Sequence, residues 1–248
     1  MSNLTNPDHK KLGDFKALCF DVYGTLIDWE SGIIDALQPL LSQSAEASRW
    51  SREETLKAFD VAEGELQVAN PTMIYSTLLA HVHAKLASQL SLPTTPELDT
   101  AFGLSVRQWK PFPDTCAALA KLSTHYKLVV LSNVDKETFG YTRKILESEG
   151  GSFSLVVTAQ DVGSYKPDER NFKYVLKEIQ EKFGIGEGQV LVTAQSLRHD
   201  HEPANKLGLS SSYIARENAI TGRGHQAKYT FTFPTLGAMA EAVEAEHM

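Results

Sequence analysis

The order of apolar and polar positions along the chain predicts two different kinds of structure. A short apolar run at residues 16–20 has no polar side after its first residue, which is typical of a strand covered on both faces. Residues 30–108 carry apolar positions at helical spacing and contain no run typical of a strand. Beyond residue 114, short apolar runs again alternate with helical patterns. The pattern therefore predicts strands on either side of an all-helical insertion.

The helical insertion has its own start and stop signals. Ser51 followed by Glu54 is a capping box, which predicts that a helix opens there. Pro93 and Pro96 separate two later helices, and the two prolines of the KPFPD segment predict a stiff crossing back to the first part of the chain. The expected helices are residues 32–41, 51–68, 73–90 and 94–109.

The remainder of the chain reads as repeated strand–helix–strand units, which imply a parallel, doubly wound sheet. The expected strands are residues 127–132, 153–158, 189–193, 211–214 and 229–233. The expected helices are residues 115–125, 138–150, 169–183, 202–207 and 236–246. The predicted fold class is α/β, a Rossmann-like core of residues 14–29 and 111–248 with an inserted all-helical cap domain of residues 30–110. The cap is expected over the carboxyl edge of the sheet, where such sheets bind ligands.

Composition narrows the function classes. Hydrophobic residues make up 42% of the chain and charged residues 22%, as in a globular protein with a substantial core. The formal charge of -7 argues against a nucleic-acid or anionic-membrane binder, because both need a basic face. Cys19 and Cys116 lie in apolar surroundings and are expected to be buried thiols of a reducing compartment. No apolar run approaches membrane-spanning length and the polar start has no signal-peptide core, so we expect a cytoplasmic protein.

Chemically useful residues collect where the predicted strands end. Taken singly, each cluster has an ordinary structural interpretation as a turn residue, a helix cap or a solvated charge. The carboxyl ends of parallel strands meet at one edge of a sheet, so their ordered recurrence predicts one shared site. The four clusters are Asp21 with the turn Gly24-Thr25, then Ser132-Asn133, Lys166-Pro167 and Asp200.

Together these clusters resemble the signature of the haloacid dehalogenase superfamily. That signature has an Asp-x-x-x-Thr after the first strand, then a Ser or Thr, a Lys and a final acidic loop. The resemblance runs from Phe15 to about Val243 and includes the helical insertion. It implies a Rossmann-like hydrolase in which Asp21 is the nucleophile.

Two positions distinguish the reactions that the superfamily catalyses. Its phosphatases carry a second Asp two residues after the nucleophile, where this chain has Tyr23, and a metal-binding acidic residue where it has Gln195. An alkoxide leaving group needs a proton donor, whereas a halide leaves as the bare anion. The Asp-x-Tyr-Gly-Thr motif resembles that of the L-2-haloacid dehalogenases in particular.

The resemblance implies a role for each site residue. Asp21 would attack the substrate, Lys166 would keep Asp21 ionised, and Asp200 would activate the water that cleaves the ester. Hydrogen bonds to substrate or nucleophile would come from Thr25, Ser132 and Asn133, with Tyr23 and Gln195 also in contact with substrate. His199 and His201 flank Asp200 and are expected to tune its basicity.

The cap departs from the dehalogenase pattern. Those enzymes use a cap arginine for the halide, and the corresponding register here puts Asp60 or a neighbour at that position. Arg52 stands at the first turn of the same helix, where a solvated role is expected. Arg107 and Trp109 are the alternative halide or carboxylate contacts, although Trp109 also fits core packing. The halide pocket is therefore the least defined part of the expected site.

The expected function is hydrolytic dehalogenation of a small 2-haloacid through an ester on Asp21, with no metal and no cofactor. The first alternative is a Mg²⁺-dependent phosphatase of the same fold that acts on a small phosphorylated metabolite. The second is a catalytically silent member that binds a metabolite or partner. The expected partner is a small anionic molecule, with neither nucleic acid nor membrane, and a homodimer is one of the oligomeric states left open.

Overall fold

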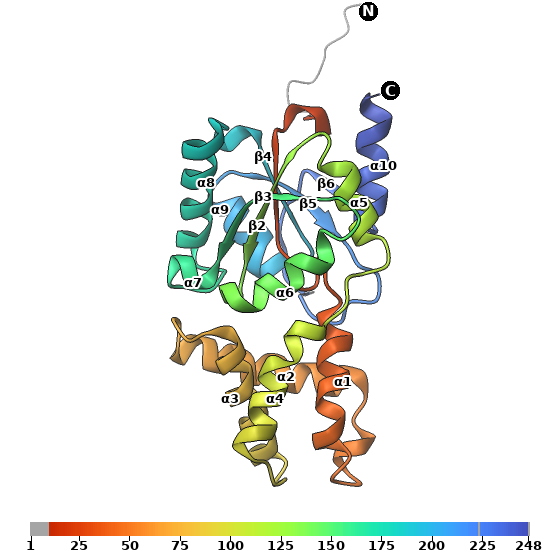
Figure 1. Cartoon of the computed structure of the whole chain (residues 1–248), viewed down its shortest axis with the longest axis vertical. Coiled ribbons are helices and arrows are strands. Elements are labelled where there is room, and N and C mark those ends of the chain that lie inside the picture. Colours follow the sequence, from red (N-terminus) through yellow and green to blue (C-terminus); the bar gives the residue numbers. More distant parts are fainter. Residues whose placement is uncertain (1–9, 223, 248) are drawn as a thin grey trace, which may run out of the picture.

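The computed structural model describes residues 10–222 and 224–247. It shows a central sheet flanked by helices, with four further helices grouped at one end (Figure 1). The first nine residues lie outside the described residues. The prediction that the chain has no signal peptide depends partly on them. No helix among the described residues is long and apolar enough to cross a bilayer.

The sheet has six strands in the order β3-β2-β1-β4-β5-β6, and every neighbouring pair is parallel. Its order reverses at β1, so the polypeptide winds outward in both directions from the first strand. The predicted doubly wound parallel sheet is confirmed. The strands are β1 Ala17–Phe20, β2 Lys127–Ser132, β3 Phe153–Thr158, β4 Val190–Ala194, β5 Ser210–Ile214 and β6 Phe231–Phe233.

Helices cover both faces of the sheet. Alternate residues of each strand point toward opposite faces, so both sets of side chains are buried. In β1, Ala17 and Cys19 belong to the apolar cluster with α8 and α9, whereas Leu18 and Phe20 pack in the cluster with α5 and α10. This explains why the first strand is apolar on every side. The helices beside the sheet are α5 Thr115–Leu122, α6 Lys136–Leu146, α7 Ala159–Val162, α8 Glu169–Phe183, α9 Glu202–Lys206 and α10 Leu236–His247.

The helical insertion contains four helices, which we call the cap helices. The predicted capping box begins α2: Ser51 Oγ accepts the N–H of Glu54 at 3.2 Å, and Glu54 accepts the N–H of Ser51 at 2.7 Å. The predicted helix at 94–109 ends sooner, at Leu104, and a 3₁₀ turn Ser105–Gln108 completes the segment. The cap helices are α1 Trp29–Leu41, α2 Arg52–Ala69, α3 Tyr75–Gln89 and α4 Pro96–Leu104.

Two connecting segments join the cap helices to the sheet, and they run side by side. Ile27 forms an antiparallel bridge with Pro111, and the N–H of Asp28 donates to the carbonyl of Lys110 at 2.8 Å. The predicted stiff crossing therefore lies at this double connection. The division into domains of residues 30–110 and the rest stays a prediction.

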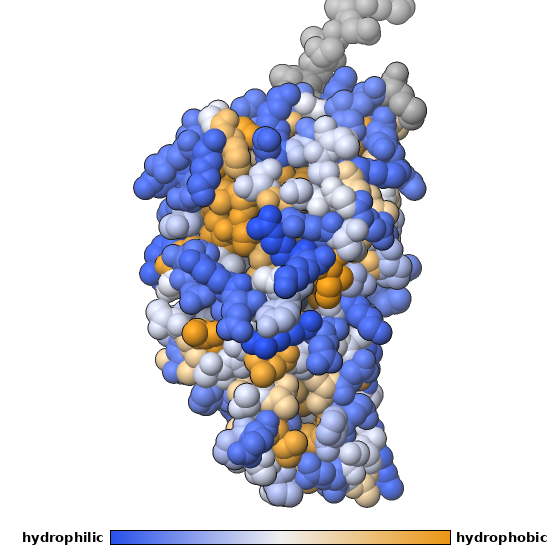
Figure 2. Space-filling view, viewed as in Figure 1, coloured by the Kyte–Doolittle hydropathy of each residue, from blue (hydrophilic) through white to orange (hydrophobic). Residues whose placement is uncertain are grey.

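Figure 2 shows hydrophilic residues over most of one face, with apolar residues in separate patches between them. The apolar residues of the two clusters described above are instead buried under the helices. The fold thus keeps its core away from solvent and leaves the carboxyl edge of the sheet facing the cap helices (Figure 1).

Candidate active site

Asp21 lies directly after β1, between the carboxyl ends of β2 and β4. Its N–H donates to the carbonyl of Thr193 at 3.2 Å, so the backbone still follows β4 at this residue. The turn that follows contains Gly24 with a φ of +97°, a conformation that other residues rarely adopt. This turn brings the Thr25 hydroxyl back to Asp21, where it donates to Oδ2 at 2.7 Å.

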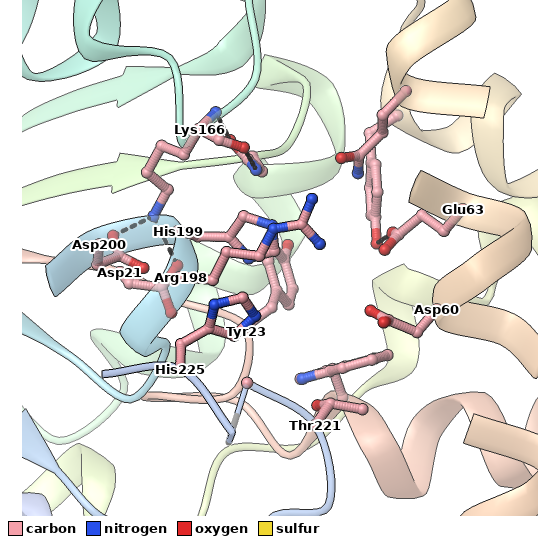
Figure 3. A pocket seen from close by; sticks show the side chains of 15 residues that line it. Asp21, Tyr23, Asp60, Glu63, Lys166, Arg198, His199, Asp200, Thr221 and His225 are labelled. Atoms are coloured by element: carbon pink, nitrogen blue, oxygen red, sulfur yellow. Dashed lines mark hydrogen bonds and ion pairs between the residues drawn. The ribbon is translucent and has the colours of Figure 1, made fainter. Parts of the chain in front are cut away.

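The ammonium group of Lys166 lies between two carboxylates (Figure 3). Nζ donates to Oδ1 of Asp21 at 2.8 Å, to Oδ1 of Asp200 at 2.7 Å and to the carbonyl of Leu131 at 2.9 Å. The three donors of the ammonium are thereby used, and Lys166 is only 2% exposed. Asn133 fixes its backbone with two hydrogen bonds, from Nδ2 to the Lys166 carbonyl at 3.0 Å and from the Lys166 N–H to Oδ1 at 2.7 Å.

The charges of this group follow from burial and proximity. Burial alone would lower the pKa of Lys166, but the carboxylates of Asp200 and Asp21 raise it well above its usual range, so it stays a cation. Burial raises the pKa of Asp200, against the attraction of Lys166. Oδ2 of Asp200 is buried and has no hydrogen-bond partner among the described residues. That oxygen can therefore accept a proton from a small molecule beside it.

Tyr23, two residues after Asp21, contributes a ring and no charge. Its hydroxyl is 3.0 Å from Oγ1 of Thr142, and its ring stacks near Tyr75 with 6.5 Å between centroids and meets Trp109 edge-on at 5.6 Å. Burial raises the pKa of the phenol well above its usual range, so the hydroxyl stays protonated. Tyr23 therefore forms a wall of the site.

A cavity of about 150 Å³ lies over Asp21, between the sheet edge and the cap helices. A space of this size holds a molecule of about six non-hydrogen atoms. The core lines it with Asp21, Tyr23, Asn133, Lys166, Arg198, His199, Asp200, Thr221, Gly222 and His225, and the cap helices with Trp29, Asp60, Glu63, Gln67 and Tyr75. The geometry thus presents a buried carboxylate to a small enclosed space.

The cap side of the cavity is acidic. Figure 3 shows Asp60 and Glu63 projecting from α2 toward the core. Glu63 accepts a hydrogen bond from the Tyr75 hydroxyl at 2.7 Å, and burial raises the pKa of Glu63 to about 7. Burial also raises the pKa of Asp60, against the attraction of Arg198. Asp60 therefore lines the cavity at the helix position where the sequence comparison expects the halide-binding arginine of the dehalogenases.

The comparison with protein families agrees with this geometry. The family model of haloacid dehalogenase-like hydrolases matches residues 15–192, well over half of the chain. The chain belongs to this family of hydrolases. The match includes both Asp21 and Lys166, while Asp200 lies beyond its end.

Solved structures resemble this hydrolase along almost its whole length. The L-2-haloacid dehalogenase of Xanthobacter autotrophicus has a TM-score of 0.73 and 19% identity, with 93% of this chain and 98% of that chain covered. The L-2-haloacid dehalogenase PA0810 has a TM-score of 0.73 and 22% identity, with 92% and 99% covered. The putative HAD-hydrolase YfnB from Bacillus subtilis, solved bound to magnesium, has a TM-score of 0.70 and 16% identity, with 94% and 99% covered. At these identities the likeness shows the fold.

The search of curated proteins found no match for this hydrolase. The specific reaction therefore has to be argued from the site itself.

Neither Arg107 nor Trp109 lines the cavity over Asp21, and their contact with substrate stays a prediction. Arg107 donates to Glu137 at 2.7 Å, and its guanidinium lies over the Tyr141 ring at 4.6 Å. Trp109 is buried against Gly32, where an added Cβ would come within 2.2 Å of the indole. The 3₁₀ turn before Trp109 directs both side chains toward packing contacts.

Three further residues predicted to contact substrate or nucleophile do not line the cavity. Thr25 bonds to Asp21 and accepts the backbone N–H of Gln195 at 2.9 Å. The side-chain amide of Gln195 donates to the Thr221 carbonyl at 3.1 Å, so it holds the loop that covers the cavity. Ser132 is buried, and its hydroxyl has no partner among the described residues. Thr25 therefore bonds the nucleophile, whereas Ser132 and Gln195 do not line the cavity and their contact with substrate stays a prediction.

Several residues that line the cavity have no role predicted from the sequence. Arg198 reaches it because a π-helical turn, Leu197–His201, follows β4, and the same turn brings His199, for which the sequence predicts only a tuning role beside Asp200. Their place directly before Asp200 was the available signal. Trp29, Thr221 and His225 gave no signal, because their segments approach Asp21 only in the folded chain.

The two histidines beside Asp200 have different surroundings. His199 lines the cavity, and burial lowers its pKa to about 4, so it is neutral at pH 7. His201 is buried against the sheet, with Nε2 3.0 Å from the Ala194 carbonyl and Nδ1 2.8 Å from Oγ of Ser211. Only His199 therefore stands where it can meet substrate.

The residues at this edge do not fit a resident magnesium ion. Mg²⁺ takes oxygen ligands in octahedral geometry, whereas here the Lys166 ammonium already lies between Asp21 and Asp200. The Gln195 amide is committed to the Thr221 carbonyl. Within residues 10–222 and 224–247, no three acidic, histidine or cysteine side chains come together as a ligand set.

Proposed function

We propose that this hydrolase removes halide from a small 2-haloacid through an ester on Asp21, without a metal ion. The observation that carries the proposal is the arrangement of Lys166 between Asp21 and Asp200, beneath a small cavity walled by Tyr23. An ammonium there keeps the nucleophile charged without a metal. Tyr23 lies where a phosphatase needs a proton donor, and its hydroxyl is occupied with Thr142.

The reaction has two steps. A carboxylate oxygen of Asp21 attacks C2 of the substrate, and the electrons of the carbon–halogen bond leave with the halide, inverting C2. Water then attacks the acyl carbon of the ester, gives a proton to Asp200, and releases the 2-hydroxy acid with Asp21 restored as a carboxylate. The halide is a weak base, so the first step needs no acid at Tyr23, and in the second step the departing alkoxide takes the proton that Asp200 accepted from water.

The state of Asp200 supports its role as the base. Its Oδ1 is held by Lys166, while Oδ2 is buried without a partner among the described residues. Burial raises the pKa of Asp200, which brings a carboxylate closer to the basicity that proton transfer from water requires.

A structural neighbour gives further support to a covalent route. The L-2-haloacid dehalogenase of Xanthobacter autotrophicus has been solved with chloropropionic acid covalently bound. That protein shares 19% identity with this chain and the same fold. The likeness makes 2-chloropropionate the first substrate to test.

The ester can be trapped by removing the base. Asp200→Asn should slow the second step more than the first, so the ester should accumulate when the variant is mixed with 2-chloropropionate. Intact-mass spectrometry should detect the adduct, and peptide mapping should find it on Asp21. Single turnover of the unmodified protein in ¹⁸O-water should label Asp21 before the product. Label that enters product directly, with no adduct on any variant, would refute the covalent route.

A chelator separates this proposal from the phosphatase alternative. Halide release should proceed equally in excess EDTA and with added Mg²⁺, because the expected ligand position holds Gln195. A parallel screen with phosphorylated metabolites should give no turnover. Phosphate release that EDTA abolishes and Mg²⁺ restores would instead support the phosphatase, and the absence of both activities would support a silent binding protein.

A further inference from the structure

The part of the cavity that faces Asp21 is formed by one side of α2. Asp60, Glu63 and Gln67 are spaced three and four residues apart, so they lie on the same side of the helix. In Figure 3, Asp60 and Glu63 reach toward the core from this helix. Among the described residues of the cap helices, no lysine or arginine lines the cavity.

The charged side chains that line the cavity do not match the single negative charge of a simple haloalkanoate. Lys166 is already shared by Asp21 and Asp200, which leaves Arg198 as the lining cation that can meet a substrate carboxylate. No lysine or arginine among the described residues pairs with Glu63. The carboxyl of Glu63 accepts a single hydrogen bond, from the Tyr75 hydroxyl. An anion with an apolar tail would bring another negative charge and leave this carboxyl facing a hydrocarbon, which is unfavourable.

Aromatic rings complete the surroundings of these carboxyl groups. Tyr23, Trp29 and Tyr75 line the same cavity, and the Tyr23 and Tyr75 rings are stacked at 6.5 Å. Faces of aromatic rings attract ammonium groups, and a nearby carboxylate adds a direct ion pair. Together with Glu63 they form a setting suited to an organic cation.

We infer that the substrate carries a protonated amine at the end that faces α2, with Glu63 as the main specificity-determining residue and Asp60 beside it. This rests on the proposed function, because the other end is then the 2-haloacid group over Asp21. The substrate carboxylate would face Arg198, the arginine that lines the cavity within the described chain. An adjoining cavity of about 220 Å³ shares Asp60, Glu63 and Gln67, so the amine end of the substrate has further room beside α2.

The inference can be tested by binding alone, with product-like ligands of equal size. The probes are 4-amino-2-hydroxybutanoate and 2-hydroxypentanoate, which differ by an ammonium group in place of a methyl group. Calorimetric titration of the unmodified protein should show the amino ligand binding about tenfold more tightly. Glu63→Gln keeps the shape of the side chain and its bond to Tyr75, and it should lose most of that preference.

Glu65→Gln is the matched control, because Glu65 lies on the same helix, pairs with Lys85 and does not line the cavity. This variant should keep the full preference. Equal affinity for the two ligands in the unmodified protein, no binding of either, or a preference that survives both Glu63→Gln and Asp60→Asn would overturn the inference.

Halide release from 2-chloropropionate and from 4-amino-2-chlorobutanoate is measured separately, so failure of the proposed function can be told apart from failure of the inference. Dehalogenation without an amine preference would overturn the inference alone. An amine preference without halide release from either haloacid would sustain the inference about Glu63 and count against the proposed reaction.

Discussion

The two walls of the cavity differ in how completely their charged groups are satisfied. At the sheet edge, Lys166 uses its three donors on Asp21, Asp200 and a backbone carbonyl, and Asn133 fixes its main chain. On the cap side, Glu63 has a single hydrogen bond from Tyr75 among the described residues. The first wall is a closed network, and the second has capacity left for a ligand.

This difference has a structural origin. At the sheet edge, Asp21 and Asn133 directly follow β1 and β2, each of which pairs with a strand on both sides, so moving either residue would disturb the ladder. The residues of α2 project from one face of a surface helix, where a side chain can change without altering the backbone. We therefore expect the edge to determine the reaction and α2 to determine which substrate enters. The predictions below test that division.

The largest effect should come from the nucleophile. Asp21→Asn keeps the size of the side chain and removes its charge, so halide release should fall by about 10⁴-fold or more. Halide release and intact-mass analysis would measure the loss of turnover and of the ester together. Substantial residual activity with unchanged folding would mean that Asp21 is not the attacking group.

A smaller effect should follow from releasing Lys166. Asn133→Ala removes both hydrogen bonds that hold the Lys166 backbone, so the ammonium should shift and kcat should fall by about ten- to a hundredfold. KM should change less, because the cap side is intact. A rise in KM with unchanged kcat would break the proposed division between the two walls.

Glu63 should also influence stability in a pH-dependent way. Its pKa is raised from 4.5 to about 7 by burial, so between these values the folded protein holds a proton that the unfolded chain has released. The free energy of unfolding should therefore fall as pH rises through this window. Glu63→Gln should remove that loss and be more stable than the unmodified protein at about pH 8, by about 1 kcal/mol, with little difference near pH 4.

Urea unfolding at several pH values would measure the effect of Glu63, with Glu65→Gln as the control. A stability difference that is the same at all pH values would contradict the burial of an ionisable carboxyl at Glu63.

The smallest effect should come from Arg107. Its guanidinium pairs with Glu137 and lies over Tyr141, away from the cavity. Arg107→Ala should change kcat and KM by less than about twofold, since partly exposed ion pairs contribute little. A clear rise in KM would show that Arg107 reaches the substrate after all.

Much of the fold could be predicted because it depends on local signals. The apolar run of β1, the capping box of α2 and the alternation after residue 114 each reflect a short-range physical preference. The early end of α4 and the π-helical turn Leu197–His201 were missed. Both depend on how the segment packs against its neighbours, which spacing along the chain does not reveal.

The site divides in the same way. The sequence by itself determined that Asp21, Lys166 and Asp200 share one edge, because strand ends in a parallel sheet must converge there. Only the tertiary structure decided that Arg107 points away and that Glu63 and Tyr75 face the cavity. These side chains come from separate helices, and their directions depend on how those helices pack, which no local pattern encodes.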